Sequence, residues 1–162
     1  MKPSSTRLAL AAAALLIAAP ATAQTALPPT SSPAASPQAT TAKECGACHM
    51  VYPASLLPAR SWTKLMGGLA SHFGENAMLD PATATTIAAF LTTNAGDVSG
   101  NRRLRGLSAS DTPLRITDTP GWIRSHRKIT AAEFSSAKVK SRSNCVACHA
   151  GAAQGSFEGD ED

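Results

Sequence analysis

The pattern CxxCH occurs twice in this chain of 162 residues, as CGACH at residues 45–49 and as CVACH at residues 145–149. Two cysteines three positions apart, with a histidine directly after them, are typical of covalent c-type haem attachment. The two thiols meet the vinyl groups at one edge of the haem, and the histidine places its imidazole under the iron. The pattern therefore predicts two covalently bound haem c groups (iron), held by the cysteines and histidines of the two copies: Cys45, Cys48, His49, Cys145, Cys148 and His149.

A Cys-x-x-Cys pair alone would also fit a redox dithiol or a zinc site. Here each pair is followed at once by histidine, and the chain has no other cysteine. These features favour haem over the two alternatives, which are a zinc site and a pair of disulfides.

Residues 1–23 have the pattern of a cleavable signal peptide. Lys2 and Arg7 precede or border an apolar run, and residues 21–23 form an A-x-A cleavage site. Because the apolar run is too short for a permanent span, we expect no stable membrane insertion after cleavage; an uncleaved anchor is the alternative. Export agrees with the haem motifs, since bacteria attach c-type haem outside the cytoplasm, and it predicts a periplasmic protein.

The mature chain divides by composition. Residues 24–42 are Pro, Ala, Ser and Thr with no charge and almost no bulky apolar side chain, which predicts a disordered tether. We expect a first haem c domain at residues 43–98, a second at 99–150 and an acidic disordered tail at 151–162. So short a chain with few aromatic residues builds only a thin core alone, so folding should depend on haem.

Apolar periodicity predicts helices mainly in the first half. Ser61 would cap a helix that carries Trp62 and Leu69 on one face and ends at Gly74. Asp80 and Pro81 would open a second helix. Shorter helices are expected from residue 119 and, with a capping box, from residue 130.

Two haems offer four axial positions, and the chain has four histidines. His49 and His72 lie 23 positions apart, as do His126 and His149. We therefore assign His72 to the first haem with His49, and His126 to the second with His149; a crossed pairing is the alternative.

Methionine is the competing axial ligand, as in Met/His cytochromes. Met78 is the only methionine that competes seriously, because Met50 directly follows His49 and Met66 belongs to the predicted apolar face. Bis-histidine ligation, in contrast, predicts low-potential, low-spin haems with no vacant site for a substrate.

Positive charge is concentrated in the second half. Residues 99–157 contain ten basic and three acidic side chains, whereas residues 24–98 contain three and four. Some arginines of the long irregular stretch at 97–119 would pair with haem propionates; the alternative is a solvated basic linker. We also expect the second half to dock an acidic partner through basic residues beside the second motif, namely Lys138, Lys140 and Arg142. Such charge complementarity mainly raises the encounter rate.

Beyond the two motifs, the chain resembles the small dihaem cytochrome c family of bacterial electron carriers. The resemblance covers about residues 43–150. It is carried by YP at 52–53, LLP at 56–58, SW at 61–62, HFGENA at 72–77, RIT at 115–117 and WIRSH at 122–126.

The resemblance implies an all-α fold, with a cytochrome c-like helical first haem domain followed by a second haem-binding segment with little regular secondary structure. It also implies bis-histidine ligation at both irons.

The implied activity is electron transfer without catalysis. The donor would be a membrane cytochrome or a quinone-linked protein, and the acceptor a soluble redox protein such as an oxygen-binding monohaem cytochrome; no nucleic-acid partner is expected. The alternative is a dihaem enzyme such as a peroxidase with one open or labile iron. The chain is short for a two-domain peroxidase, and its histidines suffice to close both irons.

Overall fold

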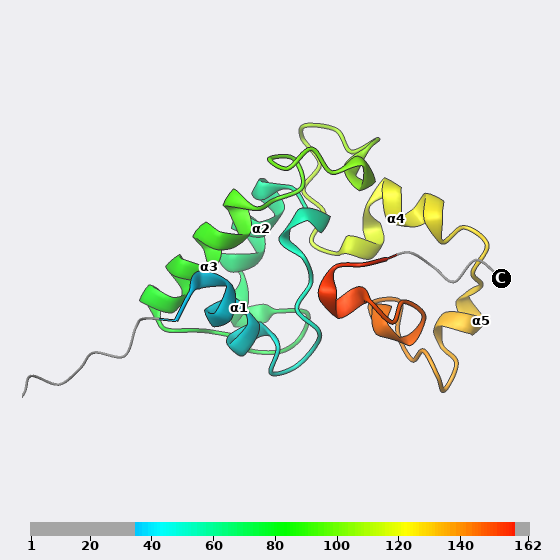
Figure 1. The fold of residues 1–162 in the computed structure, drawn as a ribbon, viewed down its shortest axis with the longest axis horizontal. Coiled ribbons are helices and arrows are strands. Elements are labelled where there is room, and N and C mark those ends of the chain that lie inside the picture. The colour runs from blue at the N-terminus through cyan, green and yellow to red at the C-terminus, as the bar shows by residue number, and fades with distance from the viewer. Residues whose placement is uncertain (1–34, 158–162) are drawn as a thin grey trace, which may run out of the picture. The chain divides into compact units, whose positions relative to one another are not determined.

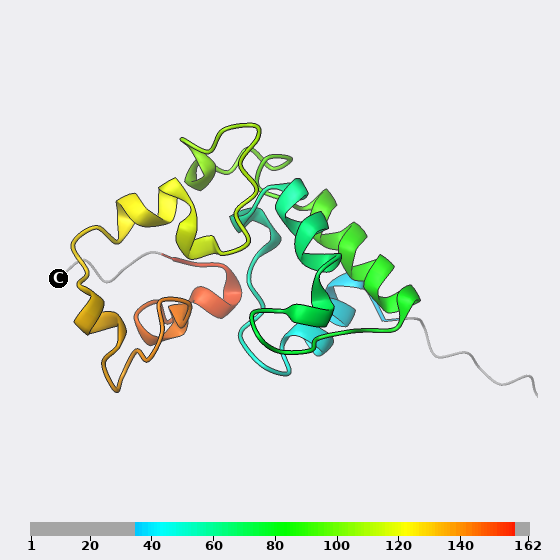
Figure 2. The same ribbon diagram turned by 180° about the vertical axis from the view of Figure 1, so that it is seen from behind.

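The computed structural model describes residues 35–157, which belong to one compact unit (Figures 1 and 2). Within this part of the chain the regular elements are all helical, and the only β-type pairing is an isolated bridge between His72 and Glu75. The expected all-α fold is confirmed. No helix in residues 35–157 is long and apolar enough to cross a membrane. The predicted signal peptide at 1–23, residues 24–34 of the tether and residues 158–162 of the tail lie outside the described residues.

Three α-helices form the first half: α1 (Pro37–Cys45), α2 (Ala59–Met66) and α3 (Pro81–Thr93). Helix α3 packs against both α1 and α2 (Figure 1). The Trp62 indole N–H donates to the Ala54 carbonyl at 2.7 Å, which satisfies the one polar atom of this buried ring. Around it lies the main apolar core, made of Ala54, Leu57, Trp62, Ile87, Leu91 and Ala95.

Helix α1 begins inside the segment predicted to be a disordered tether, so that prediction is wrong for residues 37–42. Ser36 caps the helix by accepting a hydrogen bond from the Ala39 amide at 3.2 Å, and Pro37 occupies the first turn. Thr41 is fully buried, and its hydroxyl donates to the Pro37 carbonyl at 2.8 Å. Its own helix thus satisfies its hydroxyl, which allows a polar sequence to form a packed helix.

Helix α2 also differs from the prediction at both ends. It begins at Ala59, and its first amide donates to the carboxylate of Asp97 at 2.9 Å, so the capping group comes from a distant residue and not from Ser61. Ser61 lies buried inside the helix. The helix stops at Met66 because two glycines follow, and the 3₁₀ turn η2 (Leu69–Ser71) leads to His72.

The predicted start of α3 is confirmed, since Asp80 caps it by accepting from the Thr83 amide at 3.0 Å. The predicted starts of α4 (Pro120–Ser125) and α5 (Ala131–Phe134) are confirmed as well, and both hydrogen bonds of the α5 capping box form.

Regular structure in the second half is short, as expected. Besides α4 and α5 it consists of 3₁₀ turns, and in residues 98–157 only Thr117, Thr119, Gly121 and Ala152 are buried. The 3₁₀ turns outside η2 are η1 (Ala54–Leu56), η3 (Arg102–Leu104), η4 (Ile116–Asp118), η5 (Cys145–Ala147) and η6 (Ala152–Gln154).

The predicted disordered tail is wrong for residues 151–157. Ala152 is fully buried within η6. The Phe157 ring lies 6.0 Å from the His149 ring, and the Arg103 guanidinium covers it at 5.4 Å. An aromatic side chain at the end of a polar stretch therefore holds the segment in place.

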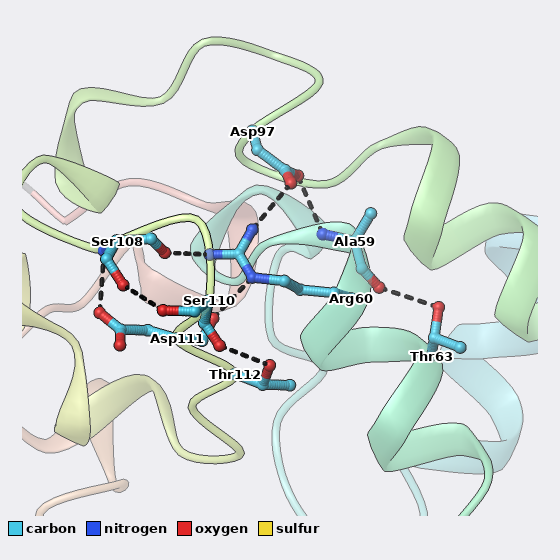
Figure 3. Close-up of polar contacts among 8 residues, drawn as sticks. All are labelled: Ala59, Arg60, Thr63, Asp97, Ser108, Ser110, Asp111 and Thr112. Atoms are coloured by element: carbon cyan, nitrogen blue, oxygen red, sulfur yellow. Dashed lines mark hydrogen bonds and ion pairs between the residues drawn. The ribbon is translucent and has the colours of Figure 1, made fainter.

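Arg60 joins helix α2 to the irregular stretch that follows α3 (Figure 3). Its guanidinium donates to the carbonyls of Ser108 at 2.8 Å and Asp111 at 2.6 Å. It also pairs with the Asp97 carboxylate at 3.5 Å. The planar fork of donors lets one side chain hold three acceptors from two parts of the chain.

We expect Arg60→Ala to lower the free energy of unfolding by about 1–3 kcal/mol, because two carbonyls and a carboxylate lose a charged donor. Denaturant unfolding of the haem-loaded protein measures this. Arg102→Ala is the control, since it removes the same charge without a side-chain hydrogen bond in the described structure. Equal stability of the two variants would contradict the role assigned to Arg60.

Candidate functional site

The first CxxCH motif straddles the end of α1. Cys45 is the last residue of the helix, and the chain then turns so that His49 is exposed. The His49 Nδ1–H donates to the Met50 carbonyl at 2.6 Å. This hydrogen bond leaves Nε2 as the nitrogen with the free lone pair, which is the atom that binds a metal.

His72 faces His49, with the two ring centres 6.3 Å apart and the planes at 26°. A tight turn presents it: the His72 amide donates to Glu75 O at 2.8 Å, and the Glu75 amide donates back at 3.1 Å. The two residues between them, Phe73 and Gly74, both have positive φ, 54° and 104°. Positive φ is uncommon for phenylalanine, so the turn that orients His72 is locally strained.

The second motif lies on the 3₁₀ turn η5, with His149 beyond it. His126, at the C-terminal end of α4, approaches His149 with ring centres 6.0 Å apart and planes at 84°. The His126 Nδ1–H donates to the Trp122 carbonyl at 2.9 Å, which again leaves Nε2 free. The His149 Nδ1 is buried without a hydrogen-bond partner among the described residues.

These two pairs fit the haem groups predicted from the motifs. Two imidazoles that share one metal ion, each with a metal–nitrogen bond of about 2 Å, have ring centres about 6 Å apart. The observed separations are 6.3 and 6.0 Å. The structure thus brings together the residues that were paired by sequence, although His72 lies beyond α2 and not on it.

Burial affects the titrating groups of both sites. Burial lowers the pKa of His72, and His49 and Arg115 lower it further, which favours the neutral ring that metal ions bind. Burial also raises the pKa of the Cys45 and Cys145 thiols. The four cysteines form no disulfide with one another. Met78, the competing ligand, is 64% exposed.

Tyr52 links the two motifs. Its ring stacks on His49 with centres 5.0 Å apart, and its hydroxyl donates to the Ser143 carbonyl at 2.9 Å. The Cys145 thiol lies 3.6 Å from that same carbonyl oxygen. The Tyr52 side chain therefore contacts a histidine of the first site and the segment that leads into the second motif.

His72 and His126, the two histidines outside the CxxCH motifs, each contact an aromatic ring that is covered by an arginine guanidinium. Phe73 lies edge-on to His72 at 4.8 Å, and the Arg115 guanidinium covers Phe73 at 4.0 Å. Trp122 stacks on His126 at 4.2 Å, and the Arg142 guanidinium covers Trp122 at 4.5 Å. Sequence reasoning missed Tyr52 and these stacks. The only hint of them is spacing: Tyr52 follows His49 by three positions, Phe73 follows His72 directly, and Trp122 precedes His126 by four.

The family model described as dihaem cytochrome c matches residues 41–157. No curated protein matches the chain.

Solved structures of diheme cytochromes c are similar to the chain. The diheme cytochrome c from Rhodobacter sphaeroides is 52% identical with a TM-score of 0.68, and the match covers 73% of this chain and 94% of that one. The diheme cytochrome type c from Shewanella baltica OS155 is 35% identical with a TM-score of 0.64, covering 76% and 89%. The similarity therefore extends over nearly the whole of both relatives.

The ring planes predict different ferric electron paramagnetic resonance spectra for the two sites. The planes lie at 26° in the first pair and at 84° in the second, and the relative orientation of two axial imidazoles sets the splitting of the iron d orbitals. We expect two resolved low-spin signals of equal intensity, with the larger highest g value from the second site. His126→Ala should remove that signal alone, and two identical signals in the wild type would contradict the prediction.

Proposed function

The chain belongs to the dihaem cytochrome c family and carries two covalently bound haem c groups, and on that premise we propose that it is a periplasmic electron carrier whose irons are both closed by two histidines. The observation that carries the proposal is the approach of His49 to His72 and of His126 to His149, with ring centres 6.3 and 6.0 Å apart.

The assignment of axial ligands follows from which rings meet. His72 lies against the histidine of the first motif and His126 against that of the second, which supports the direct pairing over the crossed one. The approach of the His72 ring to the His49 ring, with centres 6.3 Å apart, favours His72 over Met78 as the second ligand of the first iron. The hydrogen bonds from Nδ1 of His49 and His126 hold those rings with Nε2 available.

Closed irons favour a carrier over an enzyme. Each haem supplies an iron that takes up and releases one electron. If His49 with His72 and His126 with His149 hold the two irons, no position would be left for a peroxide or another substrate. What the polypeptide contributes is a fixed pair of imidazoles, so that little rearrangement accompanies the change of charge.

The location and partners complete the proposal. The signal pattern at residues 1–23 and covalent haem attachment support export to the periplasm. There the chain would receive electrons from a membrane cytochrome or quinone-linked donor and pass them to a soluble redox protein, of which an oxygen-binding monohaem cytochrome is one candidate.

Replacing a proposed ligand should open one iron. We expect His72→Ala and His126→Ala each to bind one carbon monoxide per chain in the ferrous state, whereas the wild type binds none rapidly. Absorption spectra with and without carbon monoxide measure this, after a pyridine haemochrome assay has shown two haems per chain.

Met78→Leu is the control and should remain closed. An iron opened by Met78→Leu and not by His72→Ala would make methionine the ligand. Rapid and complete carbon monoxide binding by one haem of the wild type would contradict bis-histidine ligation and support a dihaem enzyme.

The proposed docking surface for an acidic partner is the pair Lys138 and Lys140, which lie shortly before the second motif and are exposed. Arg142, grouped with them by sequence, has its guanidinium over the Trp122 ring at 4.5 Å, so its replacement would also disturb the haem site. The test of docking is therefore restricted to the two lysines.

We expect the double variant Lys138→Gln, Lys140→Gln to transfer electrons to an acidic soluble haem protein about tenfold more slowly at low salt, because long-range attraction raises encounter rates. The rates should converge with wild type at high salt, where screening acts within about 3–8 Å. Stopped-flow kinetics measures both. The matched control, Lys43→Gln with Lys64→Gln, removes the same charge from the first half; equal slowing by the control would refute this docking surface.

A further inference from the structure

A cavity of about 430 Å³ lies beside both haem sites, and its chemistry is that of an anion site. Two arginines, three residues with hydroxyl side chains and one aspartate line it. Its walls are Arg115, Thr117, Asp118, Ser141, Arg142 and Ser143. Arginine in such a setting binds carboxylates in a bidentate manner.

The two arginines belong to different haem sites. Arg115 covers Phe73, which contacts His72 of the first site. Arg142 covers Trp122, which stacks on His126 of the second. At both sites, therefore, an arginine covers an aromatic ring that contacts the histidine outside the motif, and both arginines line the same cavity.

Neither arginine has a carboxylate partner in the part of the chain that the structure describes. The ion pairs formed there are Lys43 with Glu44 and Arg60 with Asp97, and Asp118 lines the cavity without pairing. Two arginines that line one cavity place like charges in the same region, and a carboxylate for each would offset the repulsion between them.

The cavity wall is continuous with both motifs. Ser143 lines it and lies two residues before Cys145, and its carbonyl accepts the hydrogen bond from Tyr52, whose ring stacks on His49. The segment that leads into the second motif therefore forms part of the cavity wall and, through Tyr52, also contacts a histidine of the first site.

We propose that this cavity is a shared carboxylate site in which Arg115 and Arg142 receive one propionate from each of the two haems. The inference rests on the proposed function for the placement of a haem between the histidines of each pair. It goes further in making one basic site serve both irons, so that each arginine influences both reduction potentials.

Two measurements on Arg115→Gln and Arg142→Gln test it. A nearby positive charge stabilises the added electron, so each variant should lower the midpoint potentials of both haems. The larger effect is expected at the haem next to the aromatic ring that the replaced arginine covers. There the equilibrium constant for reduction should fall about tenfold, which is about 59 mV for one electron. In redox-difference infrared spectra of protein whose haem carboxyl carbons are ¹³C-labelled, each variant should shift a label-sensitive carboxylate band.

Arg102→Gln is the matched control, because it removes the same charge outside the cavity. Potentials that change no more than in this control, or that change at only one haem in each variant, would overturn the shared site. Unshifted label-sensitive bands would overturn the assignment to propionates. If a chain shortened after Phe157 reproduces the effects of the glutamine variants, the carboxylates come from the acidic C-terminal residues instead.

Lysine variants keep the test decisive where a glutamine variant fails to assemble. Arg115→Lys and Arg142→Lys preserve the charge, so the potentials should stay near those of the wild type, while the infrared band still shifts because the bidentate fork is lost. An unshifted band would refute the proposal. Carbon monoxide binding by the wild type would instead signal failure of the proposed ligation, which separates the two hypotheses.

Discussion

The imidazole pairs impose the main demand on this fold, because each brings together two segments that are 23 positions apart in sequence. The first pair is held by a packed scaffold: α2 and α3 enclose Trp62 and Ile87, and the strained turn at Phe73 projects His72 from its edge. Within residues 98–157 the second pair has no comparable core. There the Trp122 ring stacks on His126 and Phe157 contacts His149, so aromatic contacts replace a buried apolar layer.

From this asymmetry we expect the second half to depend more on its cofactor than the first half does. Trp122 and Phe134 are only half-buried, and Ile123 and Val146 are about half exposed. A porphyrin held between the rings, as proposed, would supply the apolar surface that the chain lacks. Hydrogen bonds from Arg60 to Ser108 and from Tyr52 to Ser143 connect this half to the packed one.

Sequence alone predicted those features that depend on local chemistry. The caps at Asp80 and Thr130 are local, since each side chain bonds an amide three residues ahead. The count of four axial positions predicted four histidine ligands, and the equal spacing of 23 positions predicted which histidines pair; the rings of each predicted pair meet in the structure. What could not be predicted depends on distant partners: Asp97 caps α2 across 38 positions, which displaced the predicted cap at Ser61. Likewise Phe157 orders a polar segment only because Arg103 and His149 lie nearby.

The residue after the first cysteine differs between the motifs, with Gly46 in one and Val146 in the other. Gly46 follows helix α1 directly, and a Cβ built there would collide with the carbonyl oxygen of Ala42. Val146 sits in a 3₁₀ turn with its side chain 46% exposed, where a branched residue meets no such obstacle. The two attachment sequences are therefore not interchangeable parts. A chimaera with the second motif in the first position would keep the two cysteines and the histidine and still distort the end of α1. The space around each motif therefore limits which residues can stand between its cysteines.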